Sequence, residues 1–503
     1  MAAVTIPQAF QIAQGHHQAG QLAEAETVCR QILAVDPAQP ETLHLLGLVV
    51  YAAGRTAEAT VLIERALEMA PASPTYHSNL GVILRFDGKA GRAVDHLRRA
   101  AELLPHSAPV RLNLGEALRA ADQLDESIAE TRKVLAIAPD AAAAHHNLGL
   151  ALEARGDIDE ALACLQKAVS LDPVSGNYQN SLANALMKTG RLEEAETSAR
   201  RAISLDPNLQ AAYINLGILL QLRGQYEEGW RALEWRETAQ SFALPRWDGG
   251  AAPGATLLLH AEQGLGDTLH VSRYIPLAQA RSGARVVLHC PAPLGRLLAQ
   301  SLGSSVDIAP QDEPPPAFDC HLPLMSLPHV LGLHEPLAVM GPYLQAPRPS
   351  IPEATTGLRV GLVWAGSPQF KQDRVRSISV ERLQPILEVP GVSFYSLQLG
   401  QSPPAGVTDL TADIKDFADT AALMAGLDLI ISVDTAAAHL AGTLGRPVWT
   451  LLPFVPDWRW GLEGETTPWY PTMRLFRQQT RGDWDAVIQR VAGELRTLAA
   501  RAT

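Results

Sequence analysis

Residues 71–105 decide the fold of the first half and read PASPTYHSNLGVILRFDGKAGRAVDHLRRAAELLP. The stretch begins and ends at a proline, and a proline ends a unit because it cannot continue a helix. The spacing is 34 residues throughout, at Pro37, Pro71, Pro105, Pro139, Pro173 and Pro207. A second register, also 34 residues apart with one gap, is held by Gly47, Gly81, Gly115, Gly149 and Gly217. This period predicts a solenoid of helix pairs.

Each register has a structural role. The small residue of the first helix lets a neighbouring helix approach closely, and a later glycine such as Gly88 allows the turn between two antiparallel helices. The units resemble the tetratricopeptide repeat from residue 6 to about residue 240. We therefore expect a solenoid over 1–240, with about seven units and with atypical first and last units.

A ladder of asparagines occupies one repeat position, just before Leu-Gly: Asn79, Asn113, Asn147 and Asn215. The concave face of such a solenoid is lined by the first helices. Because a carboxamide both donates and accepts, the ladder could hold the backbone of an extended peptide. The alternative is that Asn is simply the commonest residue at this repeat position. We expect an acceptor protein or peptide in this groove and leave both explanations of the asparagines open.

Composition narrows the function. The chain has 503 residues, is 47% apolar and carries a net charge of −12. The apolar share excludes general disorder, and the acidic balance argues against nucleic acid as a partner. Four cysteines share no short spacing, which argues against a disulfide scaffold and a zinc site. Without a signal-like N-terminus or a long apolar run, the sequence predicts a cytoplasmic protein with no transmembrane segment.

The second half changes period. Residues 241–255, SFALPRWDGGAAPGA, are expected to form a linker, and short strands and helices then alternate. This alternation predicts parallel sheets covered by helices, in two doubly wound lobes at 256–345 and 358–503, joined by a linker at 346–357. The expected strands are 257–260, 285–289, 359–364, 393–397, 429–433 and 448–452. The expected helices are 268–281, 294–302, 380–387, 416–425, 435–444 and 483–500. Ligands of such sheets bind beyond the carboxyl ends of the strands.

The strongest motif runs from Ile431 to Pro447 and reads ISVDTAAAHLAGTLGRP. A strand ends there, and Asp434 or Thr435 is expected to cap the following helix. The free N–H groups of a helix N-terminus attract a diphosphate. Thr435 and His439 are four residues apart and share a helix face. The alternative is an ordinary capped helix with a buried histidine.

A second motif follows the first strand of the second half. Gly264 and Gly266 would let the backbone approach a ligand, and Asp267 opens the next helix. Asp267 could be a cap, or a general base that points into the cleft. His270 and Glu262 are its candidate partners.

Two further loops carry candidate ligand contacts. The loop after strand 359–364 would suit phosphate oxygens, because it combines small residues with cations. Its candidate residues are Gly366, Ser367, Lys371, Arg376 and Ser377. The alternative is a solvated basic loop. The aromatic residues of 453–471 could stack on a base or sugar, or could form a packed loop that seals the lobe.

Together these motifs resemble glycosyltransferase family 9, the GT-B family of ADP-heptose:lipopolysaccharide heptosyltransferases, over about residues 256–490. The resemblance implies a nucleotide-sugar site at Asp434, Thr435 and His439, and a catalytic base at Asp267. Arg376 falls near the phosphate-binding lysine of the family. The first lobe is shorter than that of the family, so either the solenoid supplies the missing wall or the acceptor site is lost.

The resemblance implies an inverting transfer of a sugar from a nucleotide-sugar to a protein acceptor held by the repeats. Some proteins of this layout glycosylate flagellin. We expect no cofactor beyond the donor and no metal, because the Asp-x-Asp pairs at 157–159 and 483–485 look like helix starts. One alternative is a non-catalytic interaction scaffold with a degenerate transferase domain. Another is heptosyl transfer to lipopolysaccharide, which the acidic charge disfavours.

Overall fold

The computed structural model describes residues 5–236, 242–337, 341–349, 351, 357–367 and 373–502. The chain divides into two compact units, Met1–Pro207 and Asn208–Thr503. Among the described residues, no helix is both long enough and apolar enough to span a lipid bilayer.

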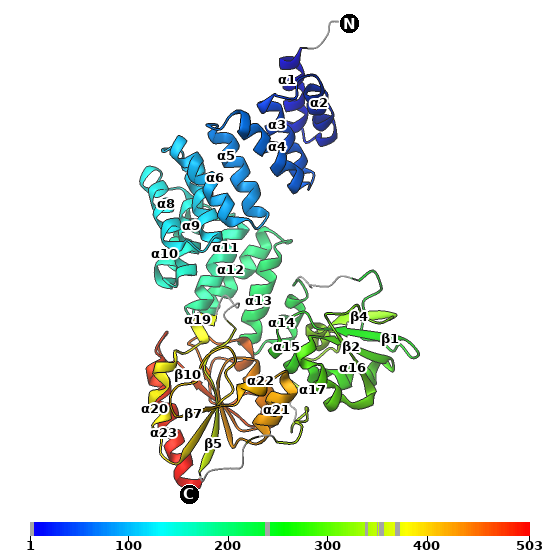
Figure 1. Cartoon of the computed structure of the whole chain (residues 1–503), viewed down its shortest axis with the longest axis vertical. Coiled ribbons are helices and arrows are strands. Elements are labelled where there is room, and N and C mark those ends of the chain that lie inside the picture. The colour runs from blue at the N-terminus through cyan, green and yellow to red at the C-terminus, as the bar shows by residue number, and fades with distance from the viewer. Residues whose placement is uncertain are drawn as a thin grey trace. The chain divides into compact units, whose positions relative to one another are not determined.

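The first unit is a solenoid of antiparallel helix pairs, which confirms the repeat interpretation (Figure 1). The first helices of the pairs are α1 (Ile6–Gln18), α3 (Pro40–Ala52), α5 (Pro74–Phe86), α7 (Ala108–Ala120), α9 (Ala142–Arg155) and α11 (Gly176–Lys188). The second helices are α2 (Leu22–Val35), α4 (Thr56–Met69), α6 (Ala90–Leu103), α8 (Leu124–Ile137), α10 (Ile158–Leu171) and α12 (Leu192–Leu205).

The glycine registers explain how the pairs pack. A Cβ atom on Gly81 would lie 2.5 Å from Cγ of Leu97, so α5 and α6 touch where only hydrogen fits. Gly88 adopts a φ of 73° in the turn between these two helices, a conformation that glycine reaches without strain. The close contact recurs at Gly47, Gly115, Gly149 and Gly217, and a positive φ recurs in the turns, which accounts for the 34-residue period.

Ion pairs connect the second helices of successive repeats. They include pairs between residues 28 positions apart, at Arg30–Glu58, Glu64–Arg92, Arg98–Glu126 and Arg132–Glu160. Their side chains are largely exposed. Exposed pairs contribute little to stability, so the buried apolar residues between the helices hold this unit together.

The second unit begins with one more helix pair, α13 (Gln210–Leu222) and α14 (Tyr226–Leu233). Helix α13 packs against the 3₁₀ helix η6 (Trp458–Trp460), and α14 packs against α18 (Leu327–Val330). The last helix pair is therefore part of the same compact unit as the two sheets. The solenoid boundary at residue 240 stays a prediction.

The first lobe is a four-stranded parallel sheet in the order β3-β2-β1-β4. Its strands are β1 (Thr256–His260), β2 (Arg285–Cys290), β3 (Val306–Pro310) and β4 (Cys320–Pro323). Its longer helices are α15 (Leu265–Val271), α16 (Ile275–Ser282) and α17 (Ala292–Leu302). The single helix expected at 268–281 is wrong: 3₁₀ helix η1 (Ser272–Tyr274) divides it, and Pro276 in the first turn of α16 cannot donate to a preceding carbonyl.

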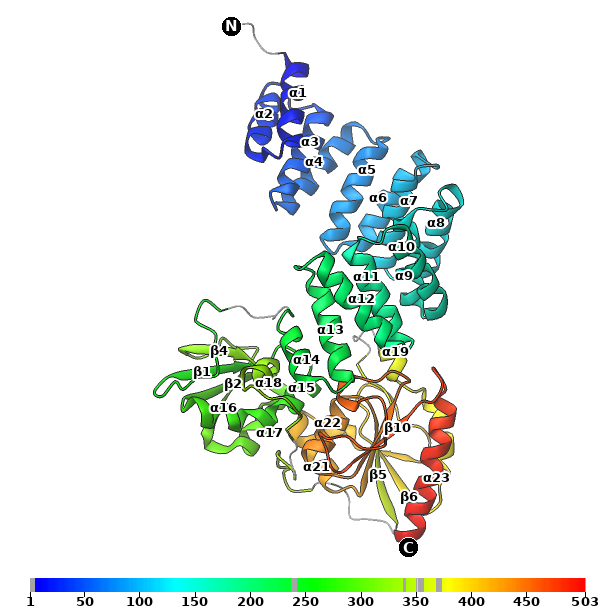
Figure 2. The same cartoon turned by 180° about the vertical axis from the view of Figure 1, so that it is seen from behind.

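The second lobe is a six-stranded parallel sheet in the order β10-β9-β8-β5-β6-β7. Its strands are β5 (Leu358–Val363), β6 (Val392–Ser396), β7 (Val407–Asp409), β8 (Leu429–Val433), β9 (Val448–Leu452) and β10 (Met473–Arg477). Its helices are α19 (Asp373–Arg376), α20 (Gln384–Leu387), α21 (Phe417–Ala425), α22 (Ala436–Thr443) and α23 (Trp484–Ala502). Helix α23 buries an apolar face against the strands, with α21 and α22 on the other side of the sheet (Figure 2). A solenoid followed by parallel α/β sheets confirms the predicted fold class.

Candidate functional site

The site is built where two helices meet, one from each lobe. Helix α15 follows β1 and helix α22 follows β8, so the carboxyl ends of the two sheets face each other there. Gly266 lies at the point of closest approach: a Cβ on it would lie 2.9 Å from Cδ2 of His439 and 3.4 Å from Cα of Ala436. The N–H of Gly264 donates to Oδ2 of Asp267 at 3.0 Å. Gly266 therefore serves the contact between the lobes, and the predicted role of both glycines beside a ligand stays a prediction.

Asp267 is held by a cation of the other lobe. Nη2 of Arg459 donates to Oδ1 of Asp267, and Nη1 donates to Oδ1 of Asp457 at 2.8 Å. The Arg459 side chain is 5% exposed and the Asp267 side chain 27%. The guanidinium also lies over the ring of Trp458, 4.3 Å from its centroid. The candidate base is thus an ion-paired carboxylate at the junction of the lobes.

Asp434 follows β8 and is buried beside the same cation. Burial and the nearby Asp457 raise the pKa of Asp434 to about 7, although Trp460, Arg376 and Arg459 pull it down. The N-cap of α22 is Thr435, whose side chain pairs with Ser432 at 3.2 Å and makes no capping hydrogen bond. The first turn of this helix therefore keeps N–H groups that no side chain caps.

The small-residue loop after β5 folds back onto α19. The N–H of Gly366 donates to Oγ of Ser377 at 2.9 Å, and Ser377 donates to Oδ2 of Asp373 at 2.7 Å. Nε of Arg376 donates to Oδ1 of Asp373 at 3.1 Å. The structure thus brings Gly366, Arg376 and Ser377 together around Asp373, which sequence reasoning missed. Ser367 is exposed, and Lys371 lies outside the described residues.

His439 and His270 share one hydroxyl group. Nδ1 of His439 lies 2.9 Å from the Tyr470 hydroxyl, and Nδ1 of His270 lies 3.2 Å from it. Burial and nearby arginines hold the pKa of both imidazoles well below its usual range, so both are neutral at pH 7. The His439 ring stacks on Trp460 with centroids 5.0 Å apart. His439 is therefore a buried histidine on helix α22, as the alternative interpretation of this motif expects.

Arg273 connects the two lobes next to His270. Its Nε donates to the carbonyl oxygen of His270 at 2.8 Å, and Nη1 donates to that of Trp469 at 3.0 Å. Nη2 donates to the hydroxyl of Tyr343 at 2.9 Å. Nothing in the local sequence marks Arg273, because two of its partners, Trp469 and Tyr343, lie far along the chain. The aromatic residues around it are buried, namely Trp458, Trp460, Trp469 and Tyr470, as expected for a packed loop that seals the lobe.

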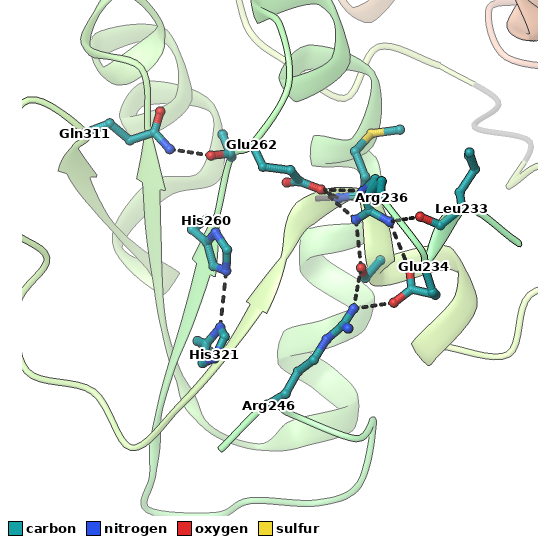
Figure 3. A network of polar contacts seen from close by, with 11 residues as sticks. Leu233, Glu234, Arg236, Arg246, His260, Glu262, Gln311 and His321 are labelled. Atoms are coloured by element: carbon teal, nitrogen blue, oxygen red, sulfur yellow. Dashed lines mark hydrogen bonds and ion pairs between the residues drawn. The ribbon is translucent and has the colours of Figure 1, made fainter. Parts of the chain in front are cut away.

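Glu262 has a different partner from the one considered for it. It lies just beyond β1, and Nη2 of Arg236 donates to its Oε1 at 2.6 Å. Figure 3 shows Arg236 between Glu262 and Glu234, with Arg246 also paired to Glu234. Burial raises the pKa of Glu262 despite this ion pair. The carboxylate therefore joins the end of the last helix pair to the first lobe, and the negative charge of Asp267 also raises its pKa.

Among the four asparagines, Asn79 and Asn147 contact side chains of the preceding repeat. Nδ2 of Asn79 lies 2.9 Å from Nε2 of His44, and Nδ2 of Asn147 donates to Glu116 at 2.9 Å. Asn113 is partly buried on α7, and Asn215 lies on α13 in the second unit. Side chains of the preceding repeat thus engage Asn79 and Asn147. Peptide binding by these residues stays a prediction.

Within the described part of the chain, no group of three or more His, Cys, Asp or Glu residues could hold a metal ion. All four cysteines are free thiols. The site instead offers two arginines, Arg376 and Arg459, and the N-terminus of α22. Sequence reasoning passed over Arg459 because it stood inside a run of aromatic residues.

Comparisons with family models find repeats in the first half of the chain and a transferase family in the second lobe. Models described as tetratricopeptide repeat match residues 16–81, 106–173, 146–209 and 180–234. The model of glycosyltransferase family 9 (heptosyltransferase) matches residues 408–481, which include Asp434, Thr435, His439 and Arg459. The chain thus combines segments that match tetratricopeptide repeats with a C-terminal segment that matches glycosyltransferase family 9.

Among curated proteins, Protein FlbA of Caulobacter vibrioides is 31% identical over 333 residues, which are 56% of this chain. The match spans about half of that relative, 54% of its length. Among solved structures, a tetratricopeptide repeat protein from Parabacteroides merdae is 15% identical, covers 46% of this chain and 91% of its own, and has a TM-score of 0.42. A thermophilic TPR protein in Thermus thermophilus is 23% identical, covers 36% of this chain and 99% of its own, and has a TM-score of 0.33.

Proposed function

We propose that this chain transfers a sugar from a nucleotide-sugar to a protein acceptor that the repeats bind. The observation that carries the proposal is the meeting of Asp267 from one lobe with Arg459 and Asp434 from the other. It places a candidate base and candidate diphosphate contacts at the carboxyl ends of two parallel sheets, where ligands of such sheets bind. The family 9 match over residues 408–481 supports the donor side.

In the proposed mechanism, Asp267 accepts the proton of the acceptor hydroxyl as that oxygen attacks the anomeric carbon. The attack comes from the face opposite the leaving group, so the configuration inverts. Arg376, Arg459 and the N–H groups at the start of α22 hold the diphosphate and stabilise its developing charge. These cations supply the charge that a divalent metal would otherwise supply, so the proposed reaction needs no metal and no cofactor beyond the donor.

The solenoid supplies the acceptor side of the proposal. Tetratricopeptide repeats indicate protein binding, and a bound acceptor raises the local concentration of its target segment at the site. Flagellin is the first acceptor to test, given the resemblance to proteins of this layout. We place the reaction in the cytoplasm, because four free thiols fit a reducing compartment.

The test is the release of nucleoside diphosphate from a panel of nucleotide-sugars by the full chain, with and without candidate acceptors. We expect Asp267→Asn to slow transfer about a thousandfold, the scale of a lost general base. Asp307→Asn is the control, because it removes the same charge from an exposed ion pair with Arg285 in the same lobe. If the wild type and Asp267→Asn are equally inert with every donor, the chain is not a transferase.

A non-catalytic scaffold is the second candidate. One observation favours it: the aromatic loop between the lobes is tightly packed, with Trp460 and Trp469 almost fully buried. An inert wild type that still captures a partner through its repeats would establish this function.

A further inference from the structure

Buried N–H groups at the junction of the lobes that have no hydrogen-bond acceptor among the described residues include Arg459 Nε, Trp469 Nε1 and His270 Nε2. Nδ1 of His270 is the acceptor of the Arg273 Nη2 donor at 3.4 Å, so Nε2 carries the proton of this neutral ring. The rings of His270 and Trp469 are in contact, with centroids 4.6 Å apart, and that of His270 lies 5.7 Å from Trp458, over which Arg459 lies. The junction therefore contains buried donors that no described acceptor pairs.

Unpaired buried donors of this kind are suited to an oxygen-rich anion. A buried polar group without a partner is costly, and buried donors left unpaired in a native protein call for an explanation. A diphosphate offers several acceptor oxygens to a guanidinium, in a geometry that a carboxylate shares. Arg459 uses its two terminal nitrogens on Asp267 and Asp457, and its Nε is still unpaired.

Asp267 sits where such an anion would bind. Its Oδ1 accepts from Arg459 and its Oδ2 accepts from the N–H of Gly264. A carboxylate that is engaged at both oxygens is poorly placed to accept a proton from an acceptor hydroxyl. Asp457 is different, because it comes from the same segment as Arg459 and remains beside the cation when the contact between lobes changes.

We propose that Asp267 occupies Arg459 in the ligand-free protein as a substitute for the donor diphosphate, and that donor binding displaces it and frees it to act as the base. This inference rests on the proposed function and adds an order to it. The donor must bind first, because only the bound diphosphate releases the carboxylate that deprotonates the acceptor. It also gives Arg459 a role in switching the site on.

The experiment is a calorimetric titration of the full chain with ADP, GDP and UDP, one at a time. If Asp267 competes with the diphosphate, Asp267→Asn binds the preferred nucleotide about tenfold more tightly than the wild type. Arg459→Gln binds it more weakly. In the Arg459→Gln background, Asp267→Asn no longer changes the affinity. Asp307→Asn, which removes the same charge elsewhere in the lobe, binds like the wild type.

A second measurement needs no variant. Carbodiimide labelling of the wild type, read by mass spectrometry, should modify Asp267 about fivefold faster when the preferred nucleotide is bound. Labelling of Asp307 should not change. Unaltered or slower labelling of Asp267 on nucleotide binding contradicts the inference.

The two proposals fail in different ways. If the wild type binds a nucleotide and Asp267→Asn binds it equally or more weakly, the displacement is wrong and the donor site stands. If neither the wild type nor any variant binds ADP, GDP or UDP, both the donor site and the displacement are wrong.

Discussion

The two compact units hold themselves together in different ways. In Met1–Pro207, ion pairs join residues 28 positions apart on neighbouring helices and are exposed, as in Arg98–Glu126. In Asn208–Thr503, the pair Asp267–Arg459 joins residues 192 positions apart, and its cation is buried. A repeat unit therefore sums local contacts, while the sheet unit depends on a few distant polar contacts. We expect mutations to have graded effects in the first unit and large effects at the junction of the second.

The largest expected effect tests the junction. Arg273→Ala removes a buried cation that donates to the carbonyl oxygens of His270 and Trp469 and to the hydroxyl of Tyr343, so each of these groups loses a donor. We expect a loss of about 3 kcal/mol in the free energy of unfolding of the second unit. Urea unfolding followed by tryptophan fluorescence measures this unit alone, because all nine tryptophans lie at or after Trp230.

The control for that variant is Arg285→Ala, which breaks an exposed ion pair with Asp307 in the same lobe. Its expected cost is at most about 0.5 kcal/mol. If both variants lost the same free energy of unfolding, the buried cation would be no more important to this unit than the exposed one.

The next effect concerns pH. The pKa of Asp434 is raised to about 7 in the folded chain from 3.8, so between these values the folded state binds more protons than the unfolded state. Stability from this group is present at low pH and is lost as pH rises toward 7. The stability advantage of Asp434→Asn over the wild type should therefore grow by about 2 kcal/mol between pH 5 and pH 8.

Tryptophan fluorescence in urea at the two pH values measures this difference. Asp307→Asn, at an exposed carboxyl, should show no such growth. A constant difference between Asp434→Asn and the wild type would mean that Asp434 is charged throughout, and that the junction tolerates its charge.

A smaller effect tests the packing of the first unit. In Gly81→Ala, the new Cβ would lie 2.5 Å from Cγ of Leu97, which forces the two helices apart. Overpacking outweighs the gain in helix propensity, for a net loss of about 1 kcal/mol. Gly91→Ala is the matched control: it lies on the partner helix, meets no atom within 4 Å, and should stabilise by about 0.5 kcal/mol. Circular dichroism at 222 nm measures the unfolding of both variants. If both substitutions changed the free energy of unfolding in the same direction, the contact between Gly81 and Leu97 would be contradicted.

The smallest effect concerns the exposed ion pairs between the second helices of successive repeats. Arg98→Ala removes the pair with Glu126 and should change stability by no more than about 0.5 kcal/mol, because both side chains are close to half exposed or more. Circular dichroism in urea measures it. A loss above about 1 kcal/mol would show that these exposed ion pairs form a cooperative network. That result would weaken the distinction between the two units.

Periodic features were predictable because each depends on neighbours in sequence. The registers of Gly81 and Gly88 specify a close helix contact and a turn, and both occur. Strands 429–433 and 448–452 were found at their observed bounds, because they are continuous apolar runs. Strands β3, β4, β7 and β10 were missed, and of these β7 is short and mostly exposed. The break of the helix at Ser272 was also missed, although Pro276 was visible in the sequence.

The sequence predicted several residues of the candidate site, but not which of them interact. Asp267 and Asp434 were singled out because each follows a strand, and the structure brings them to one junction. Their common cation, Arg459, was not identified, and neither was Asp373 beside Arg376. These partners lie in other segments of the chain, so no spacing rule relates them.

The sequence by itself determined the solenoid and the parallel sheets, because helix pairs and strand–helix alternation follow from local periods of hydrophobicity and from glycine and proline. The tertiary structure alone decided which charges meet. Whether Asp267 lies free in a cleft or against Arg459 depends on how two sheets approach, and that is set by the sum of many apolar contacts across the junction, Gly266 among them. A buried ion pair has no local signature, because its energy depends on the solvent that the rest of the fold removes.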